Sequence, residues 1–302
     1  MRTPRLLFLL ALVCAAVPAD DVREVRADLR IDVPLVLIPV QVTTALGASV
    51  PGLGRDSFHV FEDNIEQRIA SFANDDSPVS IGLLFDMSGS MRDKMRKACE
   101  SASELLKTAN PEDEFFLIEF NSRPKLVLPF TRDVDDVRRE LVHAHPFGQT
   151  SLLDAIHLGL LQMKEARYFR KAVVVLSDGG DNHSRFSEAE IKEAIVETDV
   201  QLYAMGVFGN SGVDTSTREE RDGPRLLADL ASESGGRYFP IEDIQDLPAA
   251  AARIGQELRY QYLLGYVPAN AERDGKYRRI KVVVNVPDLR ARYRPGYRAP
   301  LN

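Results

Sequence analysis

Residues 81–90 read IGLLFDMSGS, and the fold is best approached from this stretch. Its first five residues are apolar or glycine, so a strand here would be buried on both faces, as in a parallel sheet between two layers of helices. A polar turn runs from Asp86 to Ser90, and apolar residues then recur at helical spacing from Met91 onward. The stretch therefore predicts a buried strand, a polar turn and a helix, which open an α/β unit.

Similar apolar runs recur along the chain at EFFLIEF (114–120), AVVVL (172–176) and VQLYAMGV (200–207). The segments around them show helical patterns, which predict helices over Met91–Ala109, Val134–His143, Ser151–Arg167, Glu188–Thr198, Pro224–Ser234 and Ile244–Leu258. KLVLPF (125–130) adds one short extra strand. This alternation predicts a doubly wound α/β domain with a mostly parallel sheet over residues 78–257.

The segment before this domain, residues 28–76, is strand-like. A long β-branched run contains Pro34 and Pro39, which predicts an edge strand or a bent strand. Two shorter runs, SFHVF (57–61) and QRIASF (67–72), are joined by a short polar turn and predict a hairpin.

The segment after the domain, residues 258–299, is strand-like as well. Its first two alternating runs are separated by a loop containing Asp274-Gly275, which predicts a second hairpin. Neither β segment has enough strands to be stable alone, whereas together they have the size of a small sandwich. We therefore expect a small β-sandwich-like module built from both chain ends, with the α/β domain inserted into it. Two separate β appendages are the alternative.

The N-terminal residues have the layout of a secretory signal. Arg2 and Arg5 precede an apolar run from Leu6 to Val17, and small residues surround a predicted cleavage after Ala19. The run is shorter than the ~20 residues that span a bilayer. Residues 1–19 thus predict a secreted or periplasmic protein, and an uncleaved membrane anchor is the alternative.

Composition and missing motifs exclude several function classes. The chain of 302 residues has a formal charge of −7, and no basic stripe offers contacts to nucleic-acid phosphates. Neither a phosphate-cradling GxxxxGK loop nor a dinucleotide-binding GxGxxG occurs, and Asp86 stands where a nucleophile elbow needs its first glycine. These observations argue against an enzyme.

Polar residues follow the predicted strands where a doubly wound sheet binds its ligands. These are Asp86, Ser88, Ser90, Thr150 and Asp178. Two carboxylates and three hydroxyls suit a hard cation such as Mg²⁺ or Mn²⁺. The two acids balance its charge, so an incoming carboxylate could fill an open position. Ser90 as a simple helix cap is the alternative for that residue, and Asp154 either faces the site or is a first-turn acid favoured by the helix dipole.

The stretch DMSGS resembles the DxSxS motif of the von Willebrand factor type A (VWA) domain. In that family a metal-ion-dependent adhesion site (MIDAS) uses this motif plus a later Thr and Asp. The resemblance implies the same five ligands here, Asp86, Ser88, Ser90, Thr150 and Asp178, over a domain of residues 78–257. The flanking segments, among them LVLIPVQV and YLLGYVPAN, resemble a bacterial secreted group of VWA-related proteins that is abundant in acidobacteria.

The family resemblance implies an exported adhesion-type module, not an enzyme, that captures an Asp or Glu carboxylate of a protein partner through Mg²⁺ or Mn²⁺. Two alternatives stay open: a structural or assembly protein with the same fold and no metal-gated binding, and a metal-dependent hydrolase. The sequence predicts no nucleic-acid partner, a membrane contact only through an uncleaved signal, and no particular oligomeric state.

Overall fold

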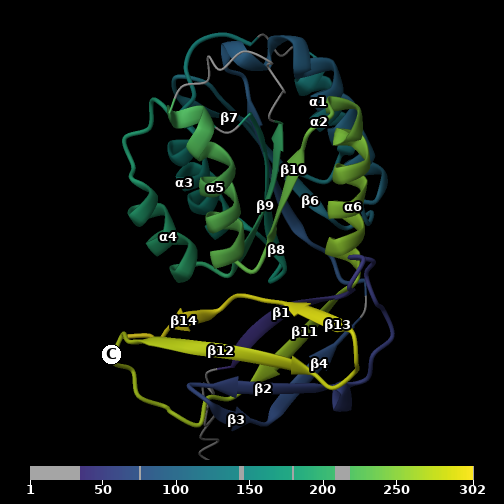
Figure 1. Ribbon diagram of the computed structural model, residues 1–302, viewed down its shortest axis with the longest axis vertical. Coiled ribbons are helices and arrows are strands. Elements are labelled where there is room, and N and C mark those ends of the chain that lie inside the picture. The colour runs from purple at the N-terminus through teal and green to yellow at the C-terminus, as the bar shows by residue number, and fades with distance from the viewer. Residues whose placement is uncertain (1–34, 75, 143–145, 179, 208–217, 302) are drawn as a thin grey trace, which may run out of the picture. The chain divides into compact units, whose positions relative to one another are not determined.

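The apolar runs form a central six-stranded sheet with the order β10-β9-β8-β5-β6-β7 in the computed structural model (Figure 1). The structure describes residues 35–301 apart from 75, 143–145, 179 and 208–217. The strands are β5 (Ser80–Asp86), β6 (Glu114–Phe120), β7 (Pro124–Thr131), β8 (Lys171–Ser177), β9 (Val200–Val207) and β10 (Arg237–Ile241). All neighbours pair in parallel except β7, which runs antiparallel to β6. The predicted doubly wound, mostly parallel sheet is therefore confirmed.

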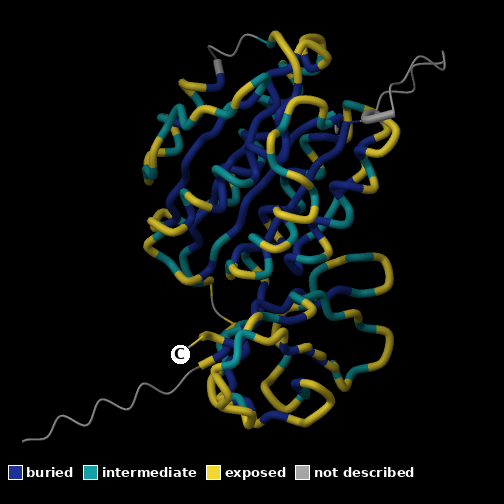
Figure 2. The backbone as a smooth tube through the Cα atoms, turned by 90° about the vertical axis from the view of Figure 1, so that its left-hand side faces the viewer, coloured by how far each residue is buried: buried dark blue, intermediate teal, exposed yellow. Residues whose placement is uncertain are grey.

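Helices cover both faces of this sheet, as Figure 1 shows. The helices are α1 (Met95–Lys107), α2 (Val134–Val142), α3 (Leu152–Gln162), α4 (Glu188–Glu197), α5 (Arg218–Glu233) and α6 (Leu247–Arg259). One core contains Leu83 of β5 with residues of α1, α2 and α6, whereas the other contains Leu84 with residues of α3, α4 and α5. Successive side chains of a strand point to opposite faces, so the apolar run of β5 is buried along its whole length. Figure 2 shows buried backbone, in dark blue, through the middle of the molecule.

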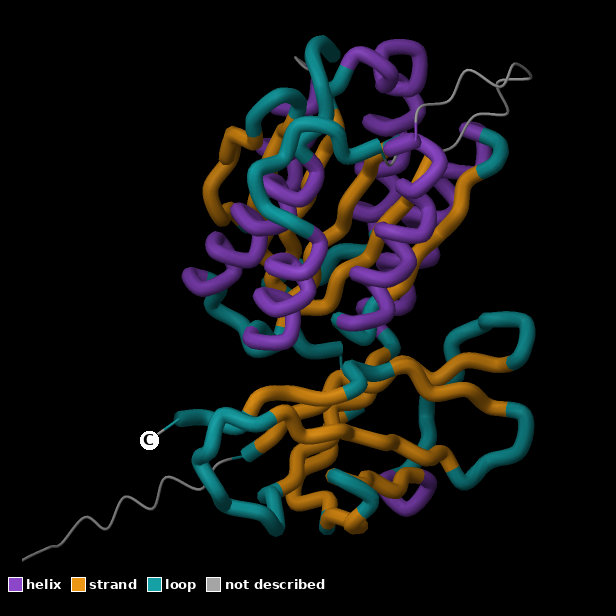
Figure 3. The backbone as a smooth tube through the Cα atoms, turned by 60° about the vertical axis from the view of Figure 1, so that its left-hand side comes forward, coloured by secondary structure: helices purple, strands orange, loops and turns teal. Residues whose placement is uncertain are grey.

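The remaining strands form two four-stranded sheets with the orders β13-β1-β11-β4 and β14-β12-β2-β3 (Figure 3). They are β1 (Val36–Thr44), β2 (Phe58–Glu62), β3 (Ile65–Gln67), β4 (Ile69–Ala73), β11 (Gln261–Tyr266), β12 (Tyr277–Val284), β13 (Leu289–Arg292) and β14 (Gly296–Arg298). Each sheet takes strands from both chain ends, and one core containing Ile38, Val60, Tyr262 and Val282 joins the two sheets. The β module of the predicted fold is thus present, and the described residues group into one compact unit.

Both predicted hairpins differ from the structure. β2 turns at Asp63 and Asn64, which adopt left-handed φ values of 47° and 69°, but across this turn it pairs with only the three residues of β3, and its other neighbour is β12. The chain then crosses to the other sheet, where β4 pairs with β11. The loop containing Asp274 likewise joins β11 and β12, which belong to different sheets and do not pair with each other. Alternation reports which residues face a core but not which strand is the neighbour.

The proline-containing run is not an edge strand, because β1 lies between β13 and β11. β13 pairs with β1 only from Gln41 to Thr44, however, so one side of Pro39 has no paired strand. A residue without an N–H is tolerated at such a position. Among the helices of the described residues, none is long and apolar enough to cross a membrane.

Candidate metal centre

The DMSGS turn gathers three of the predicted ligands at the end of β5. Asp86 is the last residue of that strand and is fully buried. Its Oδ1 accepts the backbone N–H of Ser88 at 2.8 Å, and its Oδ2 accepts the Ser177 hydroxyl at 2.6 Å. The hydroxyls of Ser88 and Ser90 lie 3.0 Å apart. Ser90 lies inside the 3₁₀ turn η2 (Gly89–Lys94), after its N-cap residue Ser88, so it is not the cap of that turn.

Thr150 is brought to this turn by backbone hydrogen bonds. The segment before α3 is tied to the DMSGS turn by a bond of 3.1 Å from Gly89 N to Gly148 O. Gly148 has a φ of 83°, where only glycine is unstrained. Thr150 itself is buried, and its backbone N–H donates to Asn182 Oδ1 at 2.9 Å. Among the described residues, no hydrogen bond joins the Thr150 hydroxyl directly to the other four predicted ligands.

Asp178 follows β8, the strand beside β5. It forms an ion pair with Lys94, a residue that the sequence did not point to. The ammonium of Lys94, from η2, lies 2.9 Å from Asp178 Oδ2. The Lys94 and Asp178 side chains retain only 23% and 12% of their exposure, so this ion pair is largely shielded from solvent. The sequence does not distinguish Lys94 from an ordinary surface lysine. Its ion pair with Asp178 forms only because β5 and β8, which are far apart in the chain, lie side by side in the sheet.

The electrostatics of Asp86 reflect two acids held close together. Burial raises the pKa of Asp86, and the charge of Asp178 raises it further, to about 6. The hydrogen bonds from Ser177 and Ser88 act in the opposite direction but do not offset these effects. Lys94 alone cannot balance both carboxylates, so the site favours additional positive charge.

The donor set fits a hard cation rather than a soft one. In the part of the chain that the structure describes, no group of three or more His, Cys, Asp or Glu side chains is placed to hold a metal. The available donors are instead two kinds of oxygen. Asp86 and Asp178 supply carboxylate oxygens, and Ser88 and Ser90 supply two hydroxyls that contact each other. Such oxygen donors suit Mg²⁺ or Mn²⁺, which also keep bound waters.

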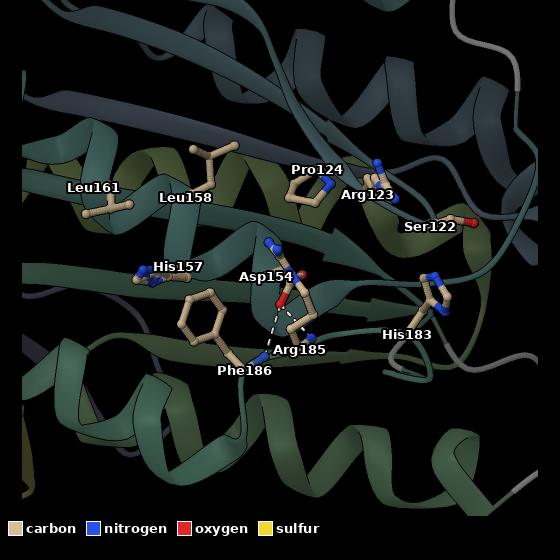
Figure 4. Close-up of a pocket in the computed structure, with 10 residues that line it drawn as sticks. All are labelled: Ser122, Arg123, Pro124, Asp154, His157, Leu158, Leu161, His183, Arg185 and Phe186. Atoms are coloured by element: carbon tan, nitrogen blue, oxygen red, sulfur yellow. Dashed lines mark hydrogen bonds and ion pairs between the residues drawn. The ribbon is translucent and has the colours of Figure 1, made fainter.

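Asp154 does not belong to this set. Its carboxylate accepts the backbone N–H groups of Arg185 and Phe186 at 2.8 and 3.1 Å and forms an ion pair with the Arg185 guanidinium (Figure 4). Burial alone would raise the pKa of Asp154, but these bonds outweigh it and lower the pKa. Asp154 therefore fixes the loop beside α3, and with His157 and His183 it lines a cavity of about 610 Å³. His143 and His145 lie outside the described residues.

Comparison with known proteins agrees with this fold. Residues 81–180 match the family model of the von Willebrand factor type A domain. A von Willebrand factor type A structure from Catenulispora acidiphila superposes with a TM-score of 0.51 at 14% identity, covering 88% of this chain and 73% of that one. Proximal thread matrix protein 1 from the mussel byssus superposes with a TM-score of 0.51 at 18% identity, covering 63% of this chain and 48% of that one.

A curated relative, an uncharacterized protein of Borreliella burgdorferi, is 21% identical over 173 residues, which are 51% of this chain and 50% of the relative. The chain thus spans about half the length of the curated relative it matches. Residues 81–180 lie in the doubly wound sheet, so the family match and the fold together support a VWA domain in this part of the chain. The narrower resemblance to an acidobacterial group stays a prediction.

Proposed function

We propose that the protein is an exported, non-enzymatic binding module that captures an acidic group of a protein partner through one bound Mg²⁺ or Mn²⁺. The ligands would be Asp86, Ser88, Ser90, Thr150 and Asp178. The observation that carries the proposal is the meeting of the DMSGS turn, the segment before α3 and the end of β8 at one edge of the sheet. The VWA domain supports a role in binding, and residues 1–19 support export.

The chemistry follows from charge balance. Asp86 and Asp178 neutralise a dication, and the serine and threonine hydroxyls add neutral oxygens that leave its affinity for anions largely intact. A partner's Asp or Glu would then complete the coordination. Lys94 pairs with Asp178, so a cation that binds Asp178 would compete with its ammonium for that carboxylate.

Thermal unfolding with and without Mg²⁺ tests the metal site. A ligand that binds the folded state but not the unfolded chain raises the melting temperature, and the rise grows with the logarithm of the free ligand concentration above Kd. We expect Mg²⁺ to raise the melting temperature of the wild type and of an Asp56→Ala control, whose acid is exposed on the β module. The Asp86→Ala/Asp178→Ala variant should lose this response. An equal response in that variant, or none in the wild type, contradicts the proposal.

Capture of a partner from bacterial extract, with and without EDTA, separates binding through the metal from the alternative of assembly without metal. Loss of capture in EDTA supports the proposed function, and unchanged capture supports the assembly role. A hydrolase is disfavoured because the Ser88 hydroxyl lies against the Ser90 hydroxyl and has no His among its hydrogen-bond partners in the described part of the chain.

A further inference from the structure

A second polar cavity, of about 380 Å³, is lined mainly by arginine and by the turn that follows β1. The four guanidinium groups come from three elements: Arg237 from β10, Arg253 from α6, and Arg290 and Arg292 from β13. None of the predicted metal ligands lines it, so this cavity is a separate feature of the molecule.

The charges around this cavity do not balance. Glu257 of α6 is fully buried, and it pairs with Arg237, with Arg292 at 3.3 Å and with Arg253 at 3.8 Å. It is the one carboxylate that pairs with any of the four arginines in the described part of the chain. Arg290 is exposed and has no described ion pair. The four guanidinium groups that line the cavity thus have one carboxylate among their described ion-pair partners, which leaves three positive charges in surplus.

Two of the arginines are also held in place by contacts with uncharged groups, which leave their positive charge unbalanced. The guanidinium of Arg237 stacks over the Phe239 ring, 4.5 Å from its centroid. Arg253 donates to the carbonyl oxygen of Gly47, where a Cβ would collide with the guanidinium. The side chains of Arg237, Arg253 and Arg292 keep 23%, 38% and 32% of their exposure, so they can be reached from solvent.

Burial and the neighbouring like charges both affect the pKa of Arg292. Burial lowers the pKa of Arg292, and although Glu257 opposes this, Arg237 and Arg253 lower it further. An anion placed among these groups would relieve their mutual repulsion. Guanidinium groups bind phosphate oxygens through pairs of parallel hydrogen bonds, and several of them around one cavity can engage one phosphate together.

We propose that this cavity is a binding site for a phosphate group, held by Arg237, Arg253, Arg290 and Arg292. A phosphate monoester carries nearly two negative charges, which matches the surplus better than a single carboxylate does. The group can come from a free phosphate compound or from the headgroup of an anionic lipid. Leu46, in the turn that lines the cavity, is 94% exposed, and it would enter the lipid surface in the second case.

Titration of inorganic pyrophosphate into the whole exported chain, followed by calorimetry and thermal unfolding, tests the site. Sodium chloride at equal ionic strength controls for screening. We expect pyrophosphate to bind and to raise the melting temperature more than chloride does. Arg290→Gln removes a charge without breaking a described contact and should weaken binding at least tenfold. Arg279→Gln removes the same charge from exposed β12 and should leave binding unchanged.

Glu257→Gln provides a readout that a purely structural role would not give. It removes the opposing charge, so pyrophosphate should bind more tightly and stabilise this variant more than the wild type. Equal stabilisation by chloride and pyrophosphate, or equal binding by the wild type and Arg290→Gln, overturns the proposal.

Sedimentation with vesicles distinguishes the two sources of the phosphate. Binding to phosphatidylglycerol vesicles but not to phosphatidylcholine, weakened in both Leu46→Asn and Arg290→Gln, supports a lipid headgroup. Pyrophosphate binding without vesicle binding supports a free phosphate compound. Failure of both ligands refutes the site and leaves the metal proposal untouched, because no residue is shared.

Discussion

Replacing Asp86 by Asn should stabilise the metal-free protein at neutral pH, although it removes a predicted metal ligand. Burial and the charge of Asp178 raise the pKa of Asp86 from 3.8 to about 6 in the folded protein. At about 1.4 kcal/mol for each pH unit, the ionised carboxylate costs about 3 kcal/mol of folding free energy above pH 6. An Asn side chain has no charge to bury, keeps an oxygen for Ser88 N and offers an amide to Ser177.

The sign of the pH dependence follows from the direction of the shift. The folded state binds a proton at Asp86 more tightly than the unfolded chain does, so this contribution to stability is fully present below pH 3.8. It is lost as the pH rises towards 6 and stays lost above it. The advantage of Asp86→Asn should therefore be small at pH 4 and reach about 3 kcal/mol at pH 8.

Urea unfolding followed by circular dichroism in EDTA, at pH 4 and pH 8, measures this difference. Asp56→Asn, at an exposed site, is the matched control and should follow the wild type. Added Mg²⁺ should reverse the order at pH 8, because only the wild type retains both acids. Two results would refute the reasoning. One is an Asp86→Asn variant that is no more stable than the wild type at pH 8 without metal, and the other is a stability advantage at pH 4 as large as that at pH 8.

Three further predictions concern single side chains. Lys94→Gln should tighten Mg²⁺ binding roughly fivefold in calorimetry, since its partly buried ion pair with Asp178 is worth about 1 kcal/mol; weaker binding would mean that Lys94 supports the site. Tyr266→Phe should cost about 1.5–3 kcal/mol in urea unfolding, because the Tyr266 hydroxyl donates at 2.7 Å to the buried carboxylate of Glu62, and a cost near zero would contradict this. Burial lowers the pKa of His157, so stability should fall as the pH drops below 6.5, and His157→Gln should reduce this acid loss; an unchanged pH profile would exclude it.

The sequence predicts the central sheet well because its strands are buried on both faces. A continuous apolar run as short as residues 81–85 is typical of a buried parallel strand, since a strand with one solvated face would alternate. The sequence does not predict β10, because RYFPI mixes Arg237 and Pro240 with only a few apolar residues, and β9 supplies its pairing. It does not predict the split between β3 and β4 either, because alternation does not specify the partner strand.

The candidate sites divide along similar lines. The predicted metal ligands Asp86, Ser88 and Ser90 share one short turn, so local sequence suffices to group them. The pairing of Lys94 with Asp178 joins residues 84 positions apart, and no local pattern reports it. The arginines around Glu257 come from three elements, and each resembles an ordinary surface residue in the sequence. Only the tertiary structure reveals clusters of this kind.

Electron paramagnetic resonance of Mn²⁺, titrated into the metal-free protein, tests the central claim most directly because it counts bound ions. The account predicts one bound Mn²⁺ per chain, displaced by Mg²⁺, and none in the Asp86→Ala/Asp178→Ala variant. Wild-type protein that leaves all the Mn²⁺ free in solution, or a double variant that binds it as well as the wild type, would contradict the account.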